Sequence, residues 1–368
     1  PAVVETKDAL DRNPAVLLTG LEHLDDRYVR AVNYSTKAAR RELPKMVLMV
    51  DIAGEDEDEV AKAASEVIRL ANARDAEGFV AVSPEARRRF WADRARTAAI
   101  AAHTNAFKIN EDVVIPLGRL ADYSEGIERI NIEQSISNKL RMLDAIEDCM
   151  QISEQEANQS DPENIDLLNQ KFDSARSLIA LSRQRWEILL KHLDDSVESQ
   201  KSILLESEQV KQDATILHQL LQKNIRVSYR KEIEKPLKLI FSGHDLLAVQ
   251  NKLDAIHKDV LSSRLFVALH MHAGDGNVHT NIPVNSSDYA MMQEAERIVD
   301  RVMQLATGLG GVISGEHGIG ITKFQYLEPQ AVQAFERYKQ QVDPSGSFNR
   351  GRSEERRVGS GCRARWAG

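Results

Sequence analysis

The chain has 368 residues, of which 42% are hydrophobic and 28% are charged. This is an ordinary globular composition, long enough for two domains or for one domain with a large insertion. The net charge of -8 argues against a broad nucleic-acid-binding surface, and the sequence has no apolar run long enough to span a membrane. The two cysteines, Cys149 and Cys362, lie far apart, which excludes a disulfide framework and favours a reducing compartment such as the cytoplasm.

Both ends of the sequence differ from the rest. The first residue is Pro1, and no signal-like segment follows it, so we expect the sequence to continue a longer protein. Residues 352–368 have no apolar periodicity and resemble the translation of a sequencing adapter. We interpret them as a non-native tail and exclude them from the fold prediction.

The first third of the chain alternates predicted strands and helices. Short apolar runs predict strands at 45–52, 78–82 and 112–117, and amphipathic stretches predict helices at 57–73 and 83–102. Ser83 and Pro84 suit the N-cap and the first position of the second helix. Residues 20–120 are therefore expected to form an α/β layer in which helices cover one side of a sheet.

The middle of the chain has a different pattern. Between residues 119 and 235 strand signals almost disappear, and no glycine follows Gly126. Apolar residues recur there at spacings of four and three, as in long helices that pack side by side. They are Leu168, Phe172, Ala175, Ile179, Trp186, Leu189 and Leu193, and then Val210, Ala214, Leu217 and Leu221. We predict an antiparallel arm of two or three long helices, with this stripe as its core.

Strands and helices alternate again after residue 236. We predict a strand at 264–272, a helix at 288–307, a glycine-rich segment at 308–320 and a last helix at 329–342. The simplest topology is one domain that the arm interrupts, so that residues 20–120 and 236–351 fold together.

Two histidines flank a tight turn in HMHAGDGNVHTNIPV, residues 270–284. The Gly-Asp-Gly-Asn run at 274–277 favours a hairpin turn, because Gly, Asn and Asp tolerate positive φ. His272 and His279 can then point at a common spot, and two imidazoles form half of a metal site. His270 shares the side of His272 by strand alternation, and we interpret it as structural.

A second motif, GLGGVISGEHGIGITK at 308–323, supplies a carboxylate and a further imidazole among glycines. It is neither a Walker loop nor a dinucleotide fingerprint. Glu316 would complete a His-His-Glu set with an open coordination position, which is the catalytic arrangement. A divalent ion there would lower the pKa of a bound hydroxyl, and the adjacent His317 is placed to accept its proton.

These two motifs resemble the C-terminal domain of the FAD-linked 2-hydroxy acid oxidases and dehydrogenases, the D-lactate, glycolate and D-2-hydroxyglutarate enzymes of the vanillyl-alcohol oxidase superfamily. The stretches at 21–27, 90–96, 111–120 and 343–352 resemble further landmarks of that family in the same order. The resemblance implies an α+β fold. We expect an α/β sandwich cap domain, an antiparallel sheet covered by helices, interrupted by a long α-helical hairpin arm.

The resemblance also implies roles for individual residues. His272, His279 and Glu316 would bind a divalent metal such as zinc, and His317 would accept the proton or else orient the substrate carboxylate. Arg94 would hold that carboxylate and take part in catalysis, as guanidinium geometry allows, although it also fits a solvated Arg-rich helix face. The remaining expected contacts are Lys108 and Asn281 to substrate, and Gly315, Gly318 and Asn349 to the flavin.

The resemblance implies four segments. Residues 1–125 and 236–351 would be the two halves of the cap domain, 126–235 an inserted helical arm as in very large family members, and 352–368 the tail. The partners would be a 2-hydroxy acid, a missing domain that binds most of the FAD, and an iron-sulfur domain of the same polypeptide. The fragment alone would be inactive, and the enzyme cytoplasmic or peripheral at the inner membrane.

Two other functions fit the same residues. A zinc hydrolase also uses His-His-Glu ligands, with a metal-bound hydroxide that attacks a carbonyl, and it would need a water-accessible cleft that this chain completes by itself. The second alternative is a non-enzymatic module whose helical arm docks a partner.

Overall fold

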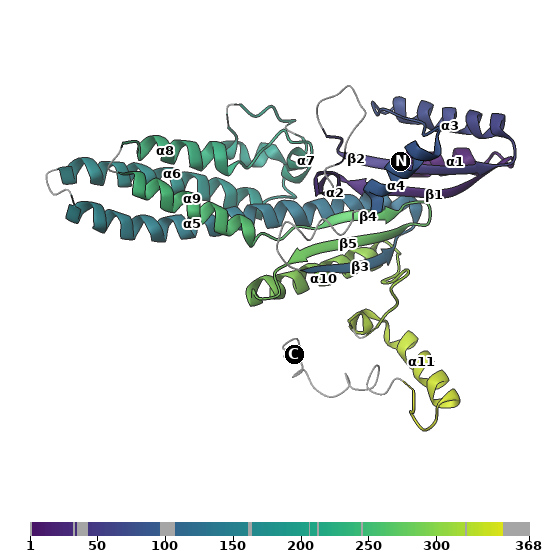
Figure 1. Ribbon diagram of the computed structural model, residues 1–368. Coiled ribbons are helices and arrows are strands. Elements are labelled where there is room, and N and C mark those ends of the chain that lie inside the picture. Colours follow the sequence, from purple (N-terminus) through teal and green to yellow (C-terminus); the bar gives the residue numbers. More distant parts are fainter. Residues whose placement is uncertain are drawn as a thin grey trace.

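The computed structural model is α+β, as predicted, with a helical arm projecting from an antiparallel sheet (Figure 1). It describes residues 2–31, 34, 43–95, 107–160, 164–205, 207–211, 213–243, 246–320 and 322–348, without the side chains of 93–95 and 157–160. Asn349 and the tail lie outside the described residues, and so does the side chain of Arg94. Among the helices of the described residues, none is both long and apolar enough to cross a membrane.

The sheet has five strands in the order β2-β1-β4-β5-β3, and every neighbouring pair is antiparallel. The strands are β1 (Val16–Asp25), β2 (Met46–Gly54), β3 (Phe107–Val114), β4 (Ala268–His272) and β5 (Asn277–Val284). Strands β4 and β5, which follow the arm in sequence, lie between β1 and β3, which precede it, so both outer parts of the chain contribute to one sheet.

Helices cover one face of this sheet. The apolar side chains of β3, β4 and β5 that point to this face pack against α10 (Tyr289–Gly308) and the first turns of α5 (Leu120–Ser160). A side chain at Gly126 would clash with Leu305 on α10, so this glycine lets the two helices approach. The β1 and β2 end of the sheet is covered by α1 (Ala2–Asp11) and α3 (Glu57–Asn72). The opposite face carries the polar residues of the site described below, and also a small apolar cluster in which Leu24 and Ala268 pack with Tyr28 and Val29 of the short helix after β1.

The helical arm has its own apolar core. It contains α5, α6 (Ile165–Lys191), α7 (Ile216–Leu221), α8 (Lys235–Ile240) and α9 (Leu247–Ser262), with shorter helical turns η4 (Val197–Ile203) and η5 (Arg230–Glu234). The predicted stripe from Leu168 to Leu193 is confirmed, because all seven of its side chains are at most 8% exposed. The core extends past residue 235, because α8 and α9 contribute Leu237, Val249 and Leu253 to it.

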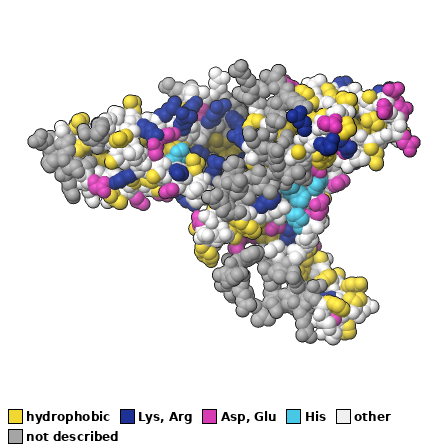
Figure 2. Space-filling model, in the orientation of Figure 1, with side chains coloured by type: hydrophobic (Ala, Val, Ile, Leu, Met, Phe, Trp, Pro, Cys, Tyr) yellow, Lys and Arg dark blue, Asp and Glu magenta, His cyan; other side chains and the backbone are white. Residues whose placement is uncertain are grey.

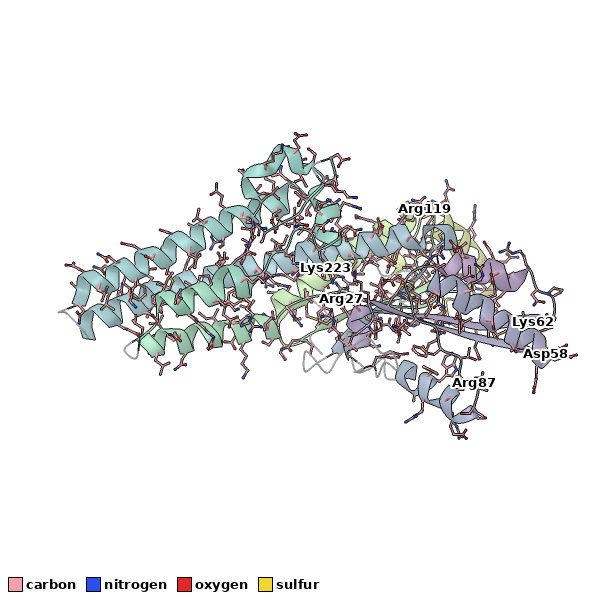
Figure 3. The ribbon with its side chains drawn as sticks, turned by 90° about the horizontal axis from the view of Figure 1, so that it is seen from above. Arg27, Asp58, Lys62, Arg87, Arg119 and Lys223 are labelled. Carbon is pink, nitrogen blue, oxygen red and sulfur yellow. The ribbon has the colours of Figure 1, made fainter. Side chains whose placement is uncertain are left out.

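An ion pair joins the root of the arm to the sheet domain, and it is formed by Arg27, which is labelled in Figure 3, with Glu128. Arg27 lies in α2 (Asp26–Ala31), directly after β1. Its guanidinium donates to both carboxylate oxygens of Glu128 on α5, at 2.5 and 3.0 Å. This two-point contact fixes orientation as well as distance.

Several predicted elements are confirmed, and others need correction. The strand at 45–52 and the helices at 57–73, 288–307 and 329–342 match β2, α3, α10 and α11 (Pro329–Val342). The helix opened by Ser83 is α4 (Pro84–Ala95), and the Ser83 hydroxyl caps it by accepting from the Ala86 amide at 3.2 Å. The other two predicted strands are shifted: β3 begins and ends earlier than 112–117, and β4 is only the last part of 264–272.

Two local predictions are wrong. Residues 78–82 form no strand, and Phe79, Val80 and Val82 are at least 50% exposed. The place beside β2 belongs instead to β1, which the sequence analysis did not predict. Val210 and Ala214 lie in irregular chain before α7 rather than on a long helix. Val210 still packs against the apolar core of the arm, and the nearby Glu208 accepts from Arg185 on α6.

Candidate metal and substrate site

The hairpin of β4 and β5 places its histidines on the polar face of the sheet. His270 pairs with His279 and His272 with Asn277 across the two strands, so all three imidazoles face the same side. The turn between the strands has the predicted tight form, with Gly276 at φ +74. A side chain at Gly276 would also come within 2.2 Å of the Ile115 carbonyl oxygen, so only glycine fits there.

The structure brings the two imidazoles and the distant carboxylate together. Nε2 of His272 lies 3.5 Å from one Glu316 oxygen, and Nε2 of His279 lies 3.7 Å from the other. One ligand atom from each residue falls within 4.8 Å of the other two, which is close enough for all three to hold one ion. The Glu316 side chain is 58% exposed, so the site is open on one side. Figure 2 shows histidine side chains gathered with acidic ones on the molecular surface.

The tautomer of His272 is set by a buried carboxylate. Glu22 on β1 accepts from Nδ1 of His272 at 2.6 Å, so Nδ1 carries the proton and Nε2 keeps its lone pair toward Glu316. A carboxylate behind a histidine in this way is the usual second contact of a metal-binding imidazole. Glu22 lies in LEHLDDR at 21–27, but its role behind His272 was not predicted from the sequence.

The second imidazole is held neutral. Burial, reinforced by the neighbouring His272 and His317, lowers the pKa of His279 to about 4. Its ring stacks on His270 at 4.5 Å with an interplanar angle of 12°. A neutral imidazole is the form that binds metals. Its Nδ1 is buried and has no hydrogen-bond partner among the described residues.

A single carboxylate holds the backbone of the second motif. Oδ2 of Asp112 on β3 accepts from the amides of Gly315, Glu316 and His317, at 2.8, 2.5 and 2.9 Å. Three successive N–H groups around one anion form a compact anion-binding turn. Sequence analysis did not assign Asp112 a role.

Asp112 is paired with a buried lysine. Lys323 donates through Nζ to Oδ1 of Asp112 at 2.5 Å and to the Asp112 carbonyl oxygen at 2.7 Å. It also lies 3.4 Å from Glu111. Burial alone would raise the pKa of Asp112, but the hydrogen bonds from Lys323 and from the loop amides outweigh it and hold the pKa well below its usual range. Asp112 is therefore expected to be ionised at neutral pH.

His317 stands at the rim of the site. Its side chain is 38% exposed, Nδ1 lies 3.5 Å from Oδ1 of Asp112, and its ring centre is 5.1 Å from that of His279. Gly315 beside it has no room for a side chain, because a Cβ would approach the Asn277 amide within 2.6 Å. Gly318, at φ +74, borders open space.

The other predicted contacts lie farther from the ligand triad. Asn281 is fully buried, and its amide donates to the His279 carbonyl oxygen at 3.1 Å and contacts His270 at 3.2 Å. Lys108 shares the strand and face of Asp112 but lies four residues away, roughly 13 Å at the usual strand rise. The backbone of Arg94 is in α4, on the β1 and β2 side of the domain.

Comparison with known protein families identifies this domain. A model of the FAD linked oxidases, C-terminal domain, matches residues 2–143 and 242–353. The chain belongs to this family. Between the two matched parts, the described residues of 144–241 belong to the helical arm.

The match extends to individual proteins. The chain is 36% identical to a mitochondrial D-lactate dehydrogenase (cytochrome) of Arabidopsis thaliana over 99 residues, which are 26% of this chain and 18% of that protein. It is 38% identical to an uncharacterized FAD-linked oxidoreductase of Mycobacterium tuberculosis over 84 residues, 22% of this chain and 17% of the relative. For glycolate oxidase subunit GlcD of Escherichia coli the values are 36% over 93 residues, 24% and 19%. The matched part is less than a quarter of each relative's length.

Proposed function

We propose that this chain is the substrate- and metal-binding part of a flavin-dependent enzyme that oxidises a 2-hydroxy acid to the 2-oxo acid. The single observation that carries the proposal is the meeting of His272, His279 and Glu316 on an open face. The family supports the flavin, and the names of the relatives, D-lactate dehydrogenase and glycolate oxidase, support the substrate class.

The donor set fits a divalent ion of the zinc type. It offers two imidazoles and one carboxylate, the number of protein ligands in a catalytic zinc site. Glu22 behind His272 and the stacked ring behind His279 orient the two lone pairs toward Glu316. Such an ion, when bound, lowers the pKa of a hydroxyl that coordinates it, which is the chemistry that oxidation of a hydroxy acid needs.

Residues of this chain would handle the proton and the carboxylate of the substrate. His317 lies next to the ligand Glu316 and near the ring of His279, so we assign it the hydroxyl proton. Orientation of the substrate carboxylate is its alternative role. We assign the carboxylate to Arg94, with Lys108 and Asn281 as further contacts.

FAD, when bound, would supply the two-electron acceptor for the oxidation. We propose that the backbone at Gly315 and Gly318 and the side chain of Asn349 face it, since Gly318 borders open space. Most of the FAD site, and an iron-sulfur domain, would come from other parts of a longer polypeptide. The segment 126–235 would be an inserted arm that docks such a domain. The enzyme would be cytoplasmic or peripheral at the inner membrane.

Anaerobic stopped-flow mixing of the FAD-loaded full-length flavoprotein tests the reaction. We expect D-lactate, glycolate or D-2-hydroxyglutarate to bleach the flavin absorbance, and a His317→Ala variant to bleach it about 100-fold more slowly or worse, as for loss of a general base. A variant of an exposed arm histidine, His218→Ala, is the control. Unchanged bleaching by the His317→Ala protein would remove its assigned role, and no bleaching by any of the three acids would contradict the substrate class.

The hydrolase alternative makes the opposite prediction. A zinc hydrolase would cleave an activated ester with this chain alone, without flavin, and the activity would disappear with His279→Ala. The oxidase proposal expects the 368-residue chain to show no such hydrolysis and no turnover by itself.

A further inference from the structure

We propose that Asp112 is the positioning residue of the site, and that it presents Glu316 and His317 to the two imidazoles through the backbone rather than by touching a ligand. The part of this inference that concerns metal binding rests on the proposed function. The part that concerns the loop rests on the geometry alone. Nothing in the sequence motifs assigns Asp112 or its partner Lys323 to the site.

The division of labour between the two carboxylate oxygens supports this role. Oδ2 accepts all three loop amides, from Gly315, Glu316 and His317. Oδ1 receives Lys323 at 2.5 Å and the Ser314 hydroxyl at 3.4 Å. An amide side chain could not do both, since it has one oxygen and its nitrogen only donates.

Strand register brings Asp112 to the two parts of the site at once. On β3 it lies directly opposite His279 on β5, and cross-strand neighbours on one face are about 5 Å apart at Cβ. The loop amides that it binds come 203–205 residues later in the chain. One side chain therefore sets the distance between a ligand on the sheet and a ligand on the loop.

Burial makes this arrangement specific. Asp112 is 0% exposed and Lys323 is 3% exposed. A buried ion pair is costly to assemble, and replacement by packed apolar residues is often neutral or stabilising. Stabilisation of the fold alone therefore does not explain why an ion pair is buried here. A buried and paired carboxylate does suit a loop whose backbone amides must all bind one anion at a fixed position.

Asp112 also faces the ring of His317. Its Oδ1 is 3.5 Å from Nδ1 of that imidazole, so the carboxylate that holds the His317 amide also borders its side chain. We infer that Asp112 orients the His317 ring as well as its backbone, which leaves Nε2 as the nitrogen available to a substrate proton.

The test uses the full 368-residue chain with two readouts, amide hydrogen exchange and Zn²⁺ binding by titration calorimetry. In Asp112→Asn we expect the amides of 315–317 to exchange roughly tenfold faster or more, as for loss of charge-assisted hydrogen bonds. We expect Zn²⁺ affinity to fall about 10- to 100-fold, as for other residues that orient metal ligands. The exposed Asp122→Asn is the matched control and should change neither.

A merely structural role predicts a different pattern. Asp112→Asn would then raise exchange across the whole sheet and leave the Zn²⁺ affinity of the folded chain unchanged. That result, or unchanged exchange at 315–317 in the folded variant, would overturn the proposal. Should Asp112→Asn fail to fold, Lys323→Met keeps the carboxylate and its three amides. It should raise exchange at 315–317 ahead of the rest of the sheet and weaken Zn²⁺ binding, and uniform exchange would overturn the proposal here too.

Failure of the proposed function gives a separate signature. If the unmodified chain takes up no Zn²⁺ while Asp112→Asn still releases the amides of 315–317, the metal proposal is wrong and the loop assignment is supported. If the unmodified chain binds Zn²⁺ and Asp112→Asn binds it equally well, the metal proposal stands and the positioning role is wrong.

Discussion

The sheet domain and the helical arm each bury a network of charges, and the two networks serve different ends. In the arm, Arg185 on α6 is 7% exposed and donates to the carboxylates of Glu208 and Glu232, at 2.7 Å each. In the sheet, Asp112 is paired with Lys323 at 2.5 Å. Both pairs have strong electrostatic complementarity, and both replace water by fixed partners.

The two networks differ in the backbone segments that their carboxylates bind. The carboxylates bound by Arg185 accept from the backbone amides of Leu205, Arg226 and Ser228, which lie in two irregular stretches of the arm on either side of α7. The carboxylate of Asp112 instead holds a loop on which the side chains of Glu316 and His317 are exposed. A buried charge network can therefore hold a segment that lacks a regular apolar stripe, or it can position reactive side chains at the surface. The exposure of the side chains on the attached segment distinguishes these two cases.

The largest effect is expected for Arg185→Met, which should cost about 3–5 kcal/mol in the free energy of unfolding, because it leaves two buried carboxylates without the positive charge that pairs with them. Urea unfolding followed by circular dichroism measures this. Zn²⁺ affinity of the folded chain should stay the same, since the network has no contact with the site.

The control lies two residues away on the same helix. Arg183 pairs with Asp144 and Glu147 at 2.7 Å, but its side chain is 24% exposed. Arg183→Met should cost less than about 1 kcal/mol. Equal losses for the two variants would mean that burial does not distinguish them, and the comparison between networks would fail.

The second effect concerns the ligands themselves. His279→Ala removes one of the three proposed ligands, and we expect Zn²⁺ affinity to fall about 100-fold or more, equivalent to about 2.7 kcal/mol. Titration calorimetry at pH 7 measures it. His218→Ala, on the arm, should leave the affinity unchanged. Zn²⁺ binding that survives in His279→Ala would show that the ion is held elsewhere.

The third effect is smaller because it acts through a ligand. Glu22→Gln weakens the acceptor behind His272 without changing its shape, and we expect about a tenfold loss of Zn²⁺ affinity. A double-mutant cycle isolates the coupling. In a His272→Ala background the Glu22→Gln change should have no further effect, and an equal loss in both backgrounds would mean that Glu22 acts independently of that ring.

The parts of the fold that sequence analysis predicted correctly have an unbroken period. The arm stripe from Leu168 to Leu193 recurs at spacings of three or four residues, with one step of seven, and is buried throughout. An apolar face of α10 is buried in the same way, whereas α3 and α11 were predicted from their spacing although they bury little or nothing. Strand β1 was missed because a register irregularity between Leu18 and Gly20 interrupts its alternation. Residues 78–82 were predicted as a strand because local apolarity cannot indicate whether a pairing partner exists.

The residues of the candidate site also fall into two groups, those that local sequence signals indicate and those that they do not. His272, His279, Glu316 and His317 could be singled out because turn chemistry and glycines mark their segments locally. Asp112 and Lys323 could not, because only the pairing of β3 with β5 brings a carboxylate from one segment to the amides of another. One local signal was available, a charged residue at the first position of the run predicted as a strand at 112–117. Period-2 alternation alone does not say which face of the sheet will carry the chemistry.

The smallest effect tests the other face of the same sheet. His23 on β1 pairs with Met271 on β4 and faces the helix-covered side, and its Nδ1 is buried without a partner among the described residues. Burial lowers the pKa of His23 from 6.5 to about 4. The unfolded chain therefore binds a proton between pH 6.5 and 4 that the folded chain does not, and stability falls as the pH is lowered through that window.

A His23→Leu variant should lose this dependence. We expect the free energy of unfolding, measured by urea titration in EDTA, to fall less steeply from pH 6.5 to 4.5, by up to about 1 kcal/mol per pH unit. His279 contributes a slope of the same sign, but it is present in both proteins and cancels in the difference. The exposed His218→Leu should leave the slope unchanged. An unchanged slope in His23→Leu would mean that the folded sheet tolerates a protonated His23 on its helix-covered face. The two faces of the sheet, one polar and functional and the other apolar and structural, would then differ less than the burial of their side chains indicates.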